Sequence, residues 1–91
     1  MDRTYTVVLL HEEDGRYSAV VPALECASWG HTIPEALRMV EEAIRCHLAS
    51  LEEHGDPVPP DVASFTVEMG DATDAVIYKL TVQEQEAASI A

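Results

Sequence analysis

The segment from Gly30 to Gly55 carries the longest uninterrupted helical pattern in the chain, and the other residues must fold so as to cover it. Apolar side chains recur along it at steps of three and four, which predicts one amphipathic helix with a single apolar stripe. Thr32, followed three residues later by Glu35, has the spacing of a capping box, so we expect the helix to begin there. Gly55 and Pro57 indicate its end, because glycine accepts a left-handed conformation and proline cannot continue a helix.

Two segments before this helix are rich in β-branched and aliphatic residues. Residues 4–11 and 16–22 flank the turn pair Asp14-Gly15, so we predict a β-hairpin, followed by a short third strand around residues 26–29. Both faces of the hairpin carry apolar side chains, whereas one helix covers only one face. The second face is therefore predicted to contact another chain or a partner.

After the helix, residues 63–69 alternate between apolar and polar side chains and are predicted to form a strand. Residues 75–82 are interpreted as a further strand, with a short helix as the alternative. Residues 83–91 are small and polar and are expected to fray. We thus expect one α+β domain over residues 1–82, with a mainly antiparallel sheet of three to five strands and one long helix on one face. The expected order is β-β-β-α-β, with a possible further strand at the C-terminal end.

Net charge restricts the class of partner. Seventeen acidic and five basic residues give a net charge of −12 at pH 7. Proteins that bind DNA or RNA place Lys and Arg against phosphates, so direct nucleic-acid binding is not expected, whereas a basic protein partner is compatible with this charge. A signal-peptide pattern and an apolar stretch near the roughly 20 residues of a membrane span are both missing from this sequence. We expect a soluble cytoplasmic protein with Cys26 and Cys46 as reduced thiols.

Residue types found in active sites occur here in unsuitable arrangements. His47 and His54 lack the i, i+4 spacing of a helical metal site, so no metal or other cofactor is expected. Cys26 lies near His31 in sequence, but nothing supplies an orienting acid or an oxyanion site. The acidic residues 12–14 fall in the hairpin turn, whereas a two-metal nuclease needs carboxylates that converge from strands. The sequence therefore predicts no enzymatic activity.

The order of these features between Tyr5 and Pro59 resembles the HicB family, the antitoxin half of a bacterial toxin–antitoxin pair. The matching positions are Tyr5, Asp14, Gly15, Tyr17, Ala19, Pro22, Leu24, Cys26, Gly30, Thr32, Glu35, Ala36, Leu37, Glu42, Ala43, Ile44, Gly55, Pro57 and Pro59. The resemblance implies a partial ribonuclease H-like module that neutralises a small basic RNase toxin of the HicA type. The chain departs from the family at Glu25, where a glycine usually precedes the cysteine. Residues 60–91 also lack the family's DNA-binding segment, which indicates a stand-alone form.

These features together predict a binding surface in place of an active site. The candidate interface consists of Tyr5, Val8, Leu10, Tyr17, Val20 and Trp29. The acidic outer side of the helix is a weaker candidate and consists of Glu41, Glu42, Glu52 and Glu53. A homo-oligomer, either a dimer or a tetramer, is expected. The alternative function is a self-associating structural or scaffold protein without a toxin partner, and a residual ribonuclease H-like hydrolase is the least favoured.

Overall fold

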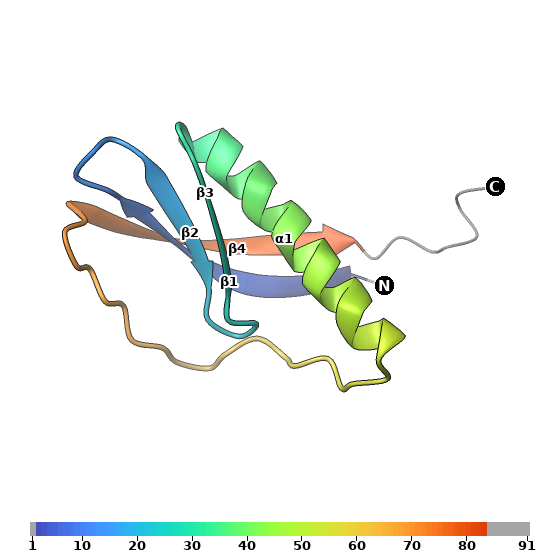
Figure 1. Cartoon of the computed structure of the whole chain (residues 1–91). Coiled ribbons are helices and arrows are strands. Elements are labelled where there is room, and N and C mark those ends of the chain that lie inside the picture. Colours follow the sequence, from blue (N-terminus) through green and yellow to red (C-terminus); the bar gives the residue numbers. More distant parts are fainter. Residues whose placement is uncertain (1, 84–91) are drawn as a thin grey trace.

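The computed structural model describes residues 2–83, which form a four-stranded antiparallel sheet and one long helix (Figure 1). The elements in chain order are β1 (Asp2–His11), β2 (Tyr17–Val21), β3 (Cys26–Gly30), α1 (Ile33–Glu53) and β4 (Asp74–Gln83). The strands lie in the order β3-β2-β1-β4, so the chain returns to the sheet beside β1 after the helix. The predicted α+β fold and element order are confirmed, and residues 75–82 belong to a strand. Of the segment predicted to fray, Gln83 ends β4 and residues 84–91 lie outside the described part.

The ends of α1 follow from its capping residues. The Thr32 hydroxyl accepts a hydrogen bond from the Glu35 amide at 3.2 Å, and the Glu35 carboxylate accepts one from the His31 amide at 2.7 Å. At the other end Gly55 has a φ of 69°, and the amides of Gly55 and Asp56 donate to carbonyls of the last turn. This is a Schellman motif, which satisfies carbonyls that the helix leaves unpaired.

The helix buries its apolar stripe against one face of the sheet, which we call the helix face. The core consists of Tyr5, Val7, Leu9, Ala19, Val21, Leu24, Ala36, Val40, Ile44, Leu48 and Val82. Each fully buried aliphatic side chain of this size contributes roughly 1.5–3 kcal/mol. Gly30 permits the close approach of β3 to α1, since a Cβ there would lie 2.6 Å from the Ala36 nitrogen. Within residues 2–83, the helix is not long and apolar enough to cross a membrane.

Residues 56–73, which we call the strap, connect the end of α1 to the start of β4 (Figure 1). The predicted strand at residues 63–69 is wrong, because the structure has irregular backbone there. Both sides of β1 are already occupied over Val8–His11, by β2 and by β4. The strap crosses the second face of the sheet, which we call the outer face. There residues 66–68, together with Val8 and Val20, line a pocket of about 280 Å³.

Asp61 fastens the strap to β1. Because β2 pairs with β1 only from Val8 onward, the Thr6 amide has no partner on β2, and it donates to the Asp61 carboxylate at 2.9 Å. The Thr6 hydroxyl donates to the other carboxylate oxygen at 2.7 Å. The Lys79 ammonium reaches that same oxygen at 2.9 Å and the Thr6 hydroxyl at 2.6 Å. A side chain thus supplies the hydrogen bonds that a neighbouring strand supplies elsewhere in the sheet.

The Asp61 contacts predict a dependence of stability on pH. Partial burial raises the pKa of Asp61, but the hydrogen bonds from Thr6 and Lys79 outweigh it and lower this pKa from 3.8 to about 2. The stabilisation is therefore complete above pH 4 and is lost as the pH falls through 2, with at most about 2 kcal/mol involved. Asp61→Asn should lower the free energy of unfolding at pH 7, and its deficit relative to wild type should shrink between pH 4 and pH 2 in urea titrations.

The strap offers a matched control for this experiment. Asp71→Asn removes an exposed carboxylate from the same segment and should change the free energy of unfolding by less than about 0.5 kcal/mol. An Asp61→Asn deficit that is the same at pH 7 and at pH 2 would show that the ionised carboxylate does not hold the strap.

Glu25 has a strained backbone. Among the non-glycine residues of 2–83 it alone has a positive φ, of 53°, and its side chain is exposed. This is the position at which the resembled family usually has glycine. A left-handed conformation costs a residue with a Cβ roughly 1–2 kcal/mol. The turn between β2 and β3 thus has the backbone geometry that glycine favours, and the backbone of Glu25 is strained in it.

Glu25→Gly should therefore raise the free energy of unfolding by about 1 kcal/mol, measured in urea at neutral pH. Glu25→Ala is the matched control, because it removes the carboxylate but retains a Cβ in the left-handed region. If the alanine variant gains as much stability as the glycine variant, the gain comes from removing a negative charge and not from relieving backbone strain.

Candidate functional site

Two rows of side chains, mostly apolar, cross the outer face near the β1–β2 turn. The strand register aligns one residue of each strand, with Ala75, Leu10, Ser18 and Trp29 in the first row and Ile77, Val8, Val20 and Ala27 in the second. The next positions along β1 and β4 are Thr6 and Lys79, which belong to the polar Asp61 contacts. The outer face is thus apolar toward one end of the sheet and polar toward the other.

The strap covers the middle of these rows and leaves their ends accessible. Val8 is only 4% exposed, and Leu10 and Val20 are half-buried beneath residues 66–68. At the two ends, by contrast, Trp29 is 48% and Ile77 is 46% exposed. The outer face is therefore partly occupied by the chain itself, and the space left for a partner lies toward the two edge strands, β3 and β4.

Trp29 is held in place by its neighbours. The Arg16 guanidinium lies over the indole ring, 5.2 Å from its centroid, and the His31 ring meets it edge-on at 5.3 Å. Asp14 in turn holds Arg16 with a 2.7 Å ion pair, and a hydrogen bond from the Arg16 amide lowers the pKa of Asp14. A large aromatic side chain that is exposed yet oriented in advance has the properties of an interface hot spot, since little conformational freedom is lost on binding.

Two of the six predicted interface residues lie on the opposite face of the sheet. Tyr5 is 2% exposed in the core under the helix, and its hydroxyl donates to the Pro59 carbonyl at 2.7 Å, so the fold places it away from the outer face. Tyr17 is half-buried on the helix face and stacks on His11 with 4.5 Å between ring centroids. Strand alternation explains both positions, because the odd-numbered residues of β1 and β2 face the helix. The structure brings the remaining four, Val8, Leu10, Val20 and Trp29, together on the outer face.

The acidic side of α1 is only partly available to a partner. Glu41 is half-buried and pairs with Arg45 one turn later at 2.8 Å, whereas Glu42, Glu52 and Glu53 are exposed. Sequence reasoning missed Ile77. The alternation along residues 75–82 was the available signal, because it places Ile77 on the face opposite to Val76 and Tyr78.

The structure contains a close pair of His and carboxylate side chains, His11 and Asp74, whose Nδ1 and Oδ2 atoms lie 4.0 Å apart. Within residues 2–83, no three His, Cys, Asp or Glu side chains are grouped so as to hold a metal ion. Burial raises the pKa of the Cys26 thiol, which keeps it protonated and weakly nucleophilic at neutral pH. Cys46 is an exposed free thiol on α1.

Comparisons with known proteins agree with this description. The model of a family described as HicB-like antitoxin of bacterial toxin–antitoxin system matches residues 5–86. A UPF0150 protein of Thermoplasma acidophilum is 45% identical over 60 residues, which cover 65% of this chain and 87% of that protein. A UPF0150 protein of Synechocystis sp. is 43% identical over 58 residues, which cover 63% of this chain and 73% of that one.

A solved structure extends the similarity to the fold. The crystal structure of the N-terminal domain of the Burkholderia pseudomallei antitoxin HicB superposes with a TM-score of 0.66 and 25% sequence identity, covering 88% of this chain and 98% of that one. The sheet-and-helix arrangement, the family match and the resemblance noted between Tyr5 and Pro59 agree. The chain belongs to the HicB-like antitoxin family of bacterial toxin–antitoxin systems.

Proposed function

We propose that this protein is a non-catalytic antitoxin that binds and neutralises a small basic RNase toxin of the HicA type. The observation that carries the proposal is the exposed Trp29, oriented by Arg16 and His31 at the end of the apolar rows on the outer face. We define the toxin-binding patch as Leu10, Val20, Ala27 and Trp29. Family membership supports an antitoxin, and the patch supplies an apolar surface with one large aromatic anchor at its edge.

Charge supports a basic partner. The net charge of −12 produces a negative field that accelerates encounters with a cationic protein. Exposed carboxylates on α1, among them Glu42, Glu52 and Glu53, contribute to this field without belonging to the patch. Association with the toxin should accordingly slow as salt is added, because screening weakens long-range attraction between exposed charges.

The same charges argue against direct binding to nucleic acid. At least three of the five basic side chains are engaged in ion pairs within residues 2–83: Arg16 with Asp14, Arg45 with Glu41 and Lys79 with Asp61. Few cations are thus available to replace the counterions of a phosphate backbone. The toxin, not DNA or RNA, is the proposed partner of this chain, and no cofactor takes part. Metal-dependent cleavage of RNA by the purified chain would contradict the non-catalytic role.

Trp29→Ala should weaken binding of a HicA-type toxin by roughly 30-fold, because truncating a hot-spot aromatic costs about 2 kcal/mol or more. Calorimetric titration of the toxin into folded wild-type and variant chains measures this change. Met39→Ala is the matched control, since Met39 is a comparably exposed apolar residue on α1, away from the patch, and its loss should change affinity by less than about threefold.

The partner to be tested is any short basic protein whose gene lies beside the gene for this chain. Lack of a complex with that product at low salt would exclude the antitoxin function and favour the alternative of a self-associating scaffold. A complex that forms but is insensitive to Trp29→Ala would retain the antitoxin function and place the toxin on another surface.

A further inference from the structure

β4 forms a long unprotected edge of the sheet. It pairs with β1 along all ten of its residues, from Asp74 to Gln83, and within residues 2–83 no strand lies on its other side. The opposite edge strand, β3, has only five residues. Long edge strands are usually protected by proline, by charged side chains, above all lysine, or by a bulge. β4 has no proline, and its single lysine, Lys79, directs its ammonium to Asp61 and Thr6 on the outer face.

Exposed apolar side chains lie on both faces of this edge. Val76 on the helix face and Ile77 on the outer face are each 46% exposed. The helix packs mainly over β2 and β3 and touches β4 in few places, so a groove of about 570 Å³ opens between α1 and β4. Its lining includes Leu37 and Leu80 together with charged residues of both signs on the helix.

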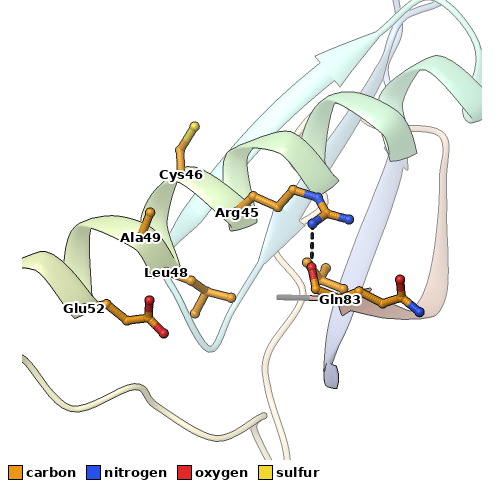
Figure 2. Close-up of a pocket in the computed structure, with 7 residues that line it drawn as sticks. Arg45, Cys46, Leu48, Ala49, Glu52 and Gln83 are labelled. Atoms are coloured by element: carbon orange, nitrogen blue, oxygen red, sulfur yellow. Dashed lines mark hydrogen bonds between the residues drawn. The ribbon is translucent and has the colours of Figure 1, made fainter. Parts of the chain in front are cut away.

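The groove continues toward the end of α1, where Figure 2 shows Arg45 reaching from the helix to the backbone carbonyl of Gln83. Beyond that contact, a second pocket of about 300 Å³ is lined by Leu48, Glu52 and Val82, among others. The side of the molecule formed by α1 and β4 is thus open along much of the helix, whereas the helix covers the side formed by β2 and β3.

We propose that a second copy of this chain pairs with β4 along this edge, antiparallel and related by a two-fold axis, so that two four-stranded sheets become one continuous sheet. The two α1 helices then lie on the same face and face each other across the joined edges. A self-complementary interface of this kind is typical of two-fold dimers. Main-chain hydrogen bonds between the strands supply affinity, and Val76 and Ile77 are buried by the partner's strand.

Local charge favours a second copy over another protein at this edge. β4 contains one acid, Asp74, and one base, Lys79, so the edge is neutral in a chain whose net charge is −12. The groove likewise presents Arg38 and Arg45 beside Glu41 and Glu42, and a two-fold axis places such mixed charges opposite their complements. Two acidic copies thus meet where electrostatic repulsion between them is weakest. A basic partner would gain the least electrostatic attraction at the same edge.

The strand sequence restricts the register. A two-fold axis perpendicular to the sheet pairs residues on the same face. It therefore passes midway between one residue of β4, the centre of the register, and the same residue of the other copy. A centre at Lys79 sets two ammonium groups opposite each other, which is unfavourable. Centres at Ile77 or Tyr78 avoid this, and they set Ile77 opposite its own copy or opposite Lys79. A lysine at position 77 therefore faces another lysine in both registers.

Ile77→Lys tests the proposal. Sedimentation equilibrium at micromolar concentration should give twice the chain mass of 10.0 kDa for the wild type and a single chain mass for the variant. Ala27→Lys is the matched control, because it adds the same charge to an exposed outer-face position of the other edge strand and should leave the dimer intact. A wild-type mass of one chain, or a dimer that survives Ile77→Lys, would overturn the proposal.

Two further measurements keep this test independent of folding and of toxin binding. Val76→Lys places the charge on the helix face of the same edge and should also give a single chain, with circular dichroism showing that both variants stay folded. In the wild type, hydrogen exchange of β4 amides should slow as protein concentration rises, and exchange that does not depend on concentration would contradict pairing at this edge.

The dimer edge is separate from the proposed toxin-binding patch. A monomeric Ile77→Lys chain should therefore still bind toxin, and Trp29→Ala should lose toxin binding but leave the dimer unchanged.

Discussion

The structure depends on satisfying the backbone hydrogen bonds of β1, which lies inside the sheet between β2 and β4. β4 pairs with β1 over the whole length of β1, whereas β2 pairs only with residues Val8 to His11 of β1. Nearer its beginning, the Asp61 carboxylate takes the place of a strand at the Thr6 amide. The strap is thus part of the sheet's hydrogen bonding and not only a connection. Because a buried unpaired amide costs roughly 1–3 kcal/mol, the hydrogen bond from the Thr6 amide to Asp61 holds the strap on β1.

The two faces of the sheet are covered unequally. On the helix face, α1 packs over β2 and β3, helped by the missing side chain of Gly30, and leaves β4 largely uncovered. On the outer face, the strap covers Val8 and leaves Trp29 and Ile77 accessible. The exposed apolar surface is therefore divided between the two edge strands. This division separates the proposed toxin-binding patch near β3 from the proposed self-pairing edge at β4.

This separation has a functional consequence for a HicB-like antitoxin. A dimer formed through β4 leaves Trp29 and its neighbours on both copies free, so one dimer presents two equivalent patches to a toxin. The negative field of the two copies adds at the patches, whereas the joined edges are locally neutral. Binding of toxin and pairing of antitoxin copies are then independent at the level of contacts, and single substitutions are able to separate them.

Local sequence signals determined the elements of this protein. The capping residues Thr32 and Glu35 and the terminal Gly55 place the helix to within a few residues, and the Asp14-Gly15 turn places the hairpin, because these signals act through neighbouring backbone groups. The order of such features also sufficed to identify the family. Alternation alone misjudged residues 63–69, because this segment crosses the outer face of the sheet and pairs with neither edge strand.

Only the tertiary structure determines which side chains are buried and which contacts they make. Only the fold shows that Tyr5 is buried under α1, that Asp61 reaches Thr6, and that the strap covers Val8. These outcomes depend on contacts between residues far apart in the chain, more than fifty positions for Tyr5 with Pro59 and for Thr6 with Asp61, which no local pattern encodes. The candidate site could therefore be predicted as a set of apolar strand residues, but its division between the Trp29 end and the β4 edge follows from where the helix and the strap lie on the sheet.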